Sequence, residues 1–124
     1  MYRNHVTLIG YLARDAEPRG ADDDNRYTVL TVVTKTSWRD KAGEWKTHSE
    51  YHRCIAWGAR FAEVATLKRG SHLQIEGELR SRDYEKDGVT QKAFEIRVST
   101  IVHLRKAWTQ TESIADSEFD SRQS

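Results

Sequence analysis

Apolar and polar side chains alternate along several stretches between residues 5 and 104. In residues 5–12, Val6, Leu8 and Leu12 share one face of an extended backbone, while Thr7 and Ile9 share the other. A period of two is typical of a β-strand, and runs rich in Val and Thr favour the same backbone because β-branched side chains are stiff. The pattern predicts five strands, at residues 5–12, 27–36, 49–57, 72–81 and 90–104.

The segments between these strands carry helix and turn signals. Residues 59–67 place their apolar side chains near helical spacing, and Gly70 lies where such a helix would end. Asp87 followed by Gly88 is a signal for a tight β-hairpin. Polar residues with proline or glycine predict loops at residues 14–25, 37–47 and 83–89.

Three strands, a short helix and two further strands are the element order of the OB-fold, a five-stranded Greek-key barrel. Strand content alone would also suit an SH3-like barrel or a small sandwich, and the position of the helix favours the OB-fold. Gly10 and Gly77 lie inside predicted strands, where a missing side chain lets a curved strand bend or another backbone approach. We predict an all-β OB-fold with one short helix between strands 3 and 4 and an extended hairpin between strands 4 and 5.

The pattern stops at residue 104. Residues 105–124 consist mostly of Ser, Thr, Gln, Asp and Glu with few apolar side chains, a composition typical of disorder. We therefore predict an OB-fold domain over residues 1–104 and a short, polar, disordered tail over residues 105–124.

Composition narrows the classes of protein and of partner. Lys and Arg number 20 against 19 Asp and Glu, so the net charge is +1 and a nucleic-acid role depends on where the charges lie. No apolar run approaches the ~18 residues of a membrane span, and no charged-then-apolar leader opens the sequence. The single cysteine, Cys54, cannot form an internal disulfide, which fits a reducing compartment. We expect a soluble protein in the cytoplasm, near the nucleoid, with no membrane partner.

No catalytic pattern stands out in the sequence. The five histidines are far apart, and none lies at a helical metal-binding spacing or beside a cysteine pair. His52 and Cys54 share one side of a predicted strand, some way apart for a nucleophile and its base. We expect a protein that is not an enzyme and that has no metal site and no cofactor.

Aromatic and basic residues interleave repeatedly, which suits the binding of single-stranded nucleic acid. Exposed base faces stack on aromatic rings at ~1 to 3 kcal/mol per base, while Lys and Arg contact the phosphates. In the competing interpretation, Tyr51 and Trp57 belong to the core and the cations form a solvated rim. The interleaved groups are Trp38 with Arg39, Tyr51 with Arg53, Trp57 with Arg60, and Tyr84 with Arg80, Arg82 and Lys86.

Several short motifs together resemble the bacterial single-stranded DNA-binding proteins of the SSB family. They occur in order at residues 4–10, 14–17, 38–40, 50–53, 56–58, 67–71 and 75–82. The resemblance implies an OB-fold that assembles as a homotetramer and wraps single-stranded DNA without sequence preference, in replication, recombination, repair or DNA transfer.

The resemblance also implies roles for individual residues. Aromatic side chains stand at all four positions that stack bases in the family: Trp38, Tyr51, Trp57 and Tyr84. His52 falls at a position associated with subunit assembly, and we place it at a subunit interface together with Tyr11 and Tyr27. Our phosphate-binding candidates are Arg3, Lys35, Arg39, Arg53, Arg60, Arg80, Arg82 and Lys86.

Some positions depart from the family pattern. Tyr11 and Ala13 replace the usual small Asn and Gly, and residues 22–24 form an acidic run beside the expected phosphate path. The tail lacks the long linker and the Pro-Phe ending through which family members recruit replication and repair proteins, so we expect no strong recruitment of this kind. The alternative function is an OB-fold module that binds a protein and has little or no affinity for DNA.

Overall fold

The computed structural model describes residues 1–20 and 25–105. The predicted tail lies outside this part except for Arg105, which ends the last strand, and residues 22–24 lie outside it as well. The elements in chain order are β1 (Val6–Leu12), β2 (Glu17–Arg19), β3 (Tyr27–Arg39), β4 (Trp45–Trp57), the 3₁₀ helix η1 (Ala59–Thr66), β5 (His72–Lys86) and β6 (Val89–Arg105).

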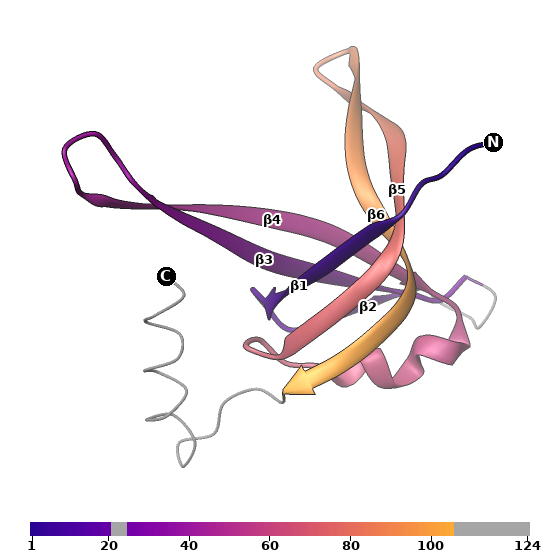
Figure 1. The fold of residues 1–124 in the computed structure, drawn as a ribbon. Coiled ribbons are helices and arrows are strands. Elements are labelled where there is room, and N and C mark those ends of the chain that lie inside the picture. The colour runs from indigo at the N-terminus through magenta and orange to yellow at the C-terminus, as the bar shows by residue number, and fades with distance from the viewer. Residues whose placement is uncertain (21–24, 106–124) are drawn as a thin grey trace.

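Five of the strands close into a barrel. They follow one another in the order β1, β5, β6, β4, β3, and β1 also pairs with β3 at Tyr11 and Leu12 (Figure 1). The pairs are antiparallel except that of β4 with β6, which run parallel where Cys54 and Ile55 meet β6. With η1 between β4 and β5, this is the OB-fold that the element order predicts.

The barrel interior is filled by the apolar side chains that alternate along the strands. Leu30 and Val32 of β3 and Leu73 and Ile75 of β5 are fully buried, and Cys54 of β4 lies among them. Phe61 of η1 joins the same cluster, so the helix covers one end of the barrel. The predicted alternation is therefore confirmed in β5 from Leu73 to Gly77, whereas β3 buries residues 28–30 and β4 buries residues 54–56 consecutively.

Two glycines allow the strands to approach closely. A Cβ atom on Gly10 would collide with the carbonyl oxygen of Val33, and one on Gly77 would collide with the carbonyl oxygen of Arg97. The register of β5 with β6 also shifts between Glu76 and Gly77, as expected for a bulge in a curved sheet. The role predicted for both glycines is confirmed.

Two hairpins extend beyond the barrel as arms (Figure 1). We call residues 34–50 the β3–β4 arm and residues 79–95 the β5–β6 arm. At the tip of the first, the Asp40 carboxylate accepts hydrogen bonds from the backbone N–H groups of Ala42 and Glu44, both at 2.9 Å. At the tip of the second, Asp87 and Gly88 have φ of 53° and 77°, which confirms the predicted tight turn.

Several elements differ in extent or type from the sequence prediction. The predicted loop at 14–25 contains β2, an edge strand that tolerates Pro18 because an edge position needs no N–H donor on its open side. The helix is a 3₁₀ helix that ends at Thr66. Strand β3 continues to Arg39 and β4 begins at Trp45, so the predicted turn at 37–47 is mostly strand. Strand β5 continues to Lys86 and β6 begins at Val89, so the predicted loop at 83–89 is reduced to Asp87 and Gly88.

Candidate nucleic-acid interface

The alternation of β4 places most of its core residues on the side opposite its candidate binding residues, although the buried Ile55 lies on the same side as Arg53 and Trp57. His52, Cys54 and Ala56 face the barrel interior, so Tyr51, Arg53 and Trp57 face outward. We call this outward side of β3, β4, β6 and β5 the outer face. Ser49 lies two residues before Tyr51 and therefore on the same side of β4. Directly opposite residues of paired strands share a side of the sheet, so Lys35 of β3, which pairs with Ser49, also lies on the outer face.

The β5–β6 arm brings its own candidates to the outer face. Arg80, Arg82 and Tyr84 alternate along β5 on the side away from Gly77, Leu79 and the interior. The guanidinium carbon of Arg82 lies 6.0 Å from the centroid of the Tyr84 ring. The Tyr84 hydroxyl donates a hydrogen bond to Gln91 at 3.3 Å.

Glu95 of β6 joins the two halves of the outer face. Its carboxylate pairs with the Nε of Arg53 at 3.4 Å and with the Nε of Arg82 at 3.3 Å. Two arginines from strands far apart in sequence are thus held side by side. Sequence reasoning did not single out Glu95, because only the pairing of β6 between β4 and β5 gives it both partners.

All four predicted stacking residues are accessible rather than core. Exposure is 65% for Tyr51, 46% for Trp38, 40% for Trp57 and 37% for Tyr84, so the interpretation of Tyr51 and Trp57 as core residues is not supported. Trp57 packs one side against Tyr27, its direct partner across the β3–β4 ladder, with ring centroids 4.6 Å apart. The rest of the Trp57 ring remains exposed.

Trp38 does not lie on the outer face. It pairs across the ladder with Lys46, and its neighbour Arg39 pairs with Trp45, so the two tryptophans occupy opposite sides of the β3–β4 arm. Trp45 is 67% exposed, and it falls inside the loop that the sequence predicted at residues 37–47. A predicted strand that began at residue 45 instead of residue 49 would have shown Trp45 to be a strand residue directly opposite an arginine.

The phosphate candidates fall into three groups. Arg53, Arg80 and Arg82 each contact a carboxylate, which for Arg80 is that of Glu78 at 3.2 Å. Arg39 lies over the Trp45 ring at 5.6 Å. Within residues 1–20 and 25–105, no carboxylate ion pair holds Arg3, Lys35, Arg60 or Lys86.

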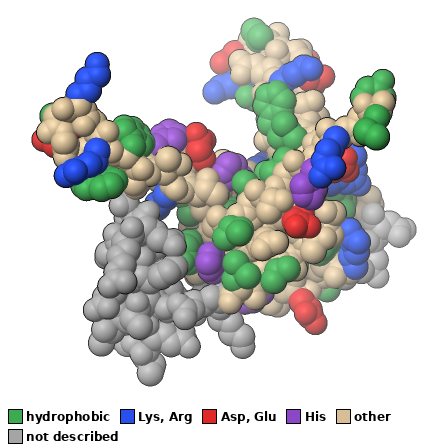
Figure 2. Space-filling model, viewed as in Figure 1, with side chains coloured by type: hydrophobic (Ala, Val, Ile, Leu, Met, Phe, Trp, Pro, Cys, Tyr) green, Lys and Arg blue, Asp and Glu red, His purple; other side chains and the backbone are tan. Residues whose placement is uncertain are grey.

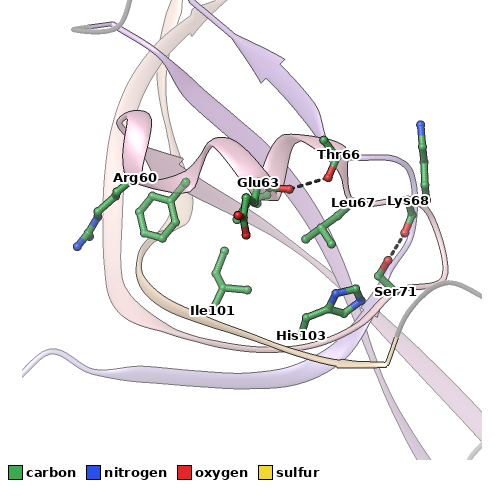
Figure 3. A pocket seen from close by; sticks show the side chains of 10 residues that line it. Arg60, Glu63, Thr66, Leu67, Lys68, Ser71, Ile101 and His103 are labelled. Carbon is green, nitrogen blue, oxygen red and sulfur yellow. Dashed lines mark hydrogen bonds between the residues drawn. The ribbon is translucent and has the colours of Figure 1, made fainter.

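Arg60 lies away from the outer-face arginines, beside a groove between η1 and the end of β6. Figure 3 shows its side chain at one end of this groove, and its guanidinium carbon is 4.5 Å from the Phe61 ring centroid. Phe61, Val64, Leu67 and Ile101 make the apolar part of the groove, which Lys68 and His103 border. The structure therefore separates Arg60 from the other phosphate candidates.

The predicted interface residues also fall in different places. Tyr11 stacks on His72 across the β1–β5 ladder, with ring centroids 4.4 Å apart and planes 10° from parallel. His52 is half-buried, and its Nε2 is hydrogen-bonded to the Thr34 hydroxyl at 2.9 Å. Tyr27 lies against Trp57 on the outer face. The roles predicted for these three residues remain predictions.

The described residues hold no arrangement typical of a metal site. No group of three or more His, Cys, Asp or Glu side chains converges within residues 1–20 and 25–105. Burial raises the pKa of the Cys54 thiol to about 12, so this thiol stays protonated near neutral pH and is a poor nucleophile. In the same part of the chain, no helix is long and apolar enough to cross a membrane.

A closed OB barrel with accessible aromatic rings and arginines along one face is the architecture of proteins that hold single-stranded nucleic acid. The family comparison agrees with this class. The chain belongs to the single-strand binding protein family, whose model matches residues 3–104.

Solved structures share this fold. An SSB from Plasmodium falciparum, in complex with single-stranded DNA, matches with a TM-score of 0.74 and 19% identity over 84% of this chain and 96% of that one. The single-stranded DNA-binding protein of Thermus aquaticus matches with a TM-score of 0.68 and 28% identity, over 83% of this chain and 51% of that one. A small single-stranded DNA-binding protein from Streptomyces coelicolor matches with a TM-score of 0.65 and 16% identity, over 83% and 95%.

Proposed function

We propose that this protein binds single-stranded DNA without sequence preference and protects it during replication, recombination, repair or DNA transfer. The observation that carries the proposal is the outer face, where Tyr51, Trp57 and Tyr84 lie exposed among arginines that Glu95 holds together. Family membership supports the same ligand. Trp38 adds a further ring from the other side of the β3–β4 arm.

The chemistry of the outer face favours single strands over duplex. Flat rings stack on base faces, which are buried in a duplex and accessible in a single strand. Stacking requires no particular base, because every base has a π-face. Binding of this kind needs no bond-making step, so we propose a binding protein rather than an enzyme, acting in the cytoplasm at the nucleoid.

The ion pairs of the outer face set the electrostatics of binding. With a net charge of only +1, the protein attracts DNA through local clusters rather than through its overall charge. Arg53 and Arg82 each use one Nε–H toward Glu95, which leaves the other N–H groups of each guanidinium for phosphates. Lys35 and Lys86 have no carboxylate partner among residues 1–20 and 25–105, so within this part of the chain they are available for phosphates without breaking an ion pair.

We expect oligo-dT to bind far more tightly than duplex DNA of the same length and to quench tryptophan fluorescence, because stacking changes indole emission. The affinity should fall as salt rises, with a log–log slope of about 0.7 per phosphate contact, because bound cations release counterions. The measurement is a fluorescence titration with both ligands at several salt concentrations. Absence of oligo-dT binding at low salt would favour the alternative function, a module that binds protein.

We also propose that the protein assembles into a homotetramer made of two dimers. The outward side of β1, β5 and β6 carries an apolar patch of exposed Ile9, Val102 and Leu104 beside the Tyr11–His72 stack. Figure 2 shows hydrophobic side chains gathered on this side of the barrel. Within the described residues, the edge of β1 from Val6 to Ile9 pairs with no strand on the side away from β5, so a second copy could extend the sheet there.

Light scattering at micromolar concentration should give a mass several times the 14.4 kDa of one chain. Ile9→Lys should lower that mass, because a subunit interface would bury an unpaired charge, while the monomer tolerates Lys at a site that is 55% exposed. Val89→Lys, at an exposed site on the β5–β6 arm, is the matched control and should leave the mass unchanged. A single 14.4 kDa species for the wild type would contradict the assembly.

A further inference from the structure

Trp45 is a large apolar side chain that the barrel does not use. It begins β4 at the tip of the β3–β4 arm, is 67% exposed, and lies outside the apolar cluster of the interior. Arg39 stands directly opposite on β3, with its guanidinium carbon 5.6 Å from the Trp45 ring centroid. The arm tip thus presents an aromatic ring and a cation together, far from the core.

The position of Trp45 on β4 relates it to two residues of the proposed site. Trp45, Tyr51 and Trp57 are spaced six residues apart, and an even spacing places all three on the same side of the strand. At about 3.3 Å per residue, successive rings lie roughly 20 Å apart along the strand. The rings of Trp45 and Tyr51 are both about two-thirds exposed.

Cations lie at intervals along the same side of the β3–β4 ladder. Arg53 lies between Tyr51 and Trp57 on β4. Lys35, opposite Ser49, lies between Tyr51 and the arm tip, and Arg39 lies opposite Trp45. Each interval between rings therefore holds a cation that a phosphate could contact.

The opposite side of the arm offers no such continuation for Tyr51. Trp38 and Lys46 lie on that side, and farther along β4 the same side carries the half-buried His52 and then faces the barrel interior. A strand of DNA that leaves Tyr51 along the outer face reaches Trp45 before it reaches Trp38.

We propose that Trp45 is a further base-stacking subsite for single-stranded DNA, at the far end of a track that runs along β4 from Trp57 through Tyr51. Arg39 lies against the ring and is the phosphate contact for the nucleotide stacked there. The track winds with the twist of the two-stranded arm. This inference rests on the proposed function and extends its site outward from the barrel.

The test compares Trp45→Ala with the wild type on oligo-dT ligands from about 4 to about 16 nucleotides, the range of site sizes per OB-fold. The variant should bind the longest ligands roughly 5-fold to 150-fold more weakly, the loss expected for one stacked base, and the shortest ligands nearly as well. Its affinity should stop rising at a shorter ligand length than that of the wild type. Trp45→Tyr should restore most of the loss, because it keeps a ring.

Two controls separate this subsite from a structural role for the Trp45–Arg39 pair. Phe94→Ala removes another exposed ring, on the side of the β5–β6 arm opposite Tyr84, and should leave oligo-dT binding unchanged at every length. Thermal unfolding should give the same Tm for Trp45→Ala and the wild type. Equal affinity of Trp45→Ala and wild type at every length would overturn the inference, as would an equal loss at all lengths with a lowered Tm. Failure of the wild type to bind any oligo-dT would overturn the proposed function itself.

Discussion

Replacing Tyr51 and Trp57 together by alanine is expected to weaken oligo-dT binding by about 2 to 6 kcal/mol, or roughly 30-fold to 20,000-fold. Each ring supplies ~1 to 3 kcal/mol of stacking, and the two lie about 20 Å apart on β4. Losses at such separated sites add. The measurement is a titration of the single and double variants at one salt concentration.

The same variants distinguish stacking from a structural role. Truncating a core aromatic costs ~3 to 5 kcal/mol of folding stability, whereas these side chains are 65% and 40% exposed and should cost much less. Trp57→Ala should show the larger effect on Tm, because Trp57 also packs on Tyr27. Tyr51→Phe with Trp57→Phe is the matched control and should keep most of the affinity. A folded double alanine variant that binds like the wild type would exclude both residues as stacking platforms.

Gly77→Ala is expected to destabilise the barrel by about 3 kcal/mol or more, the upper end of the usual range for overpacking. The added methyl group would collide with the carbonyl oxygen of Arg97, and this oxygen belongs to the β6 backbone, which is paired with β5. Separating the two strands there would also disturb the buried Ile96 and Val98. The Tm should fall by roughly 10 °C or more.

Gly43→Ala provides the comparison for steric collision. Gly43 has φ of 81°, which strains any other residue by ~1 to 2 kcal/mol, but its Cβ would meet open space at the tip of the β3–β4 arm. Its Tm should fall less than that of Gly77→Ala. If Gly77→Ala unfolds at the same Tm as the wild type, the close packing of β5 against β6 does not require a glycine at position 77.

Local patterns were sufficient to predict the barrel. Alternation along residues 5–12 and 72–81 follows from burial of one side of each strand, and the structure buries Leu12, Leu73 and Ile75. The tight turn at Asp87 and Gly88 is likewise a local property, because it needs positive φ at both residues. β2 escaped prediction because an edge strand of three residues carries no alternation of its own.

The sequence by itself determined the order of the five barrel strands and the helix, the residues that share a face in the strands at 5–12 and 72–81, and which residue types are available for stacking. It did not determine the extent of the arms, because there both sides of β3 and β4 are largely exposed and no burial imposes a period of two. For the same reason, only the extension of β4 to Trp45 and its pairing with β3 showed that Trp45 shares the outer side with Tyr51 while Trp38 faces away.

Tertiary pairing also decided which charges and rings meet. Arg53 and Arg82 share Glu95 because β6 lies between β4 and β5, and Trp57 meets Tyr27 because of the β3–β4 register. These contacts join residues about 10 to 40 positions apart, whereas periodicity describes neighbours along one strand. The register between strands, set by the packed barrel as a whole, turned separate aromatic and basic residues into one binding face.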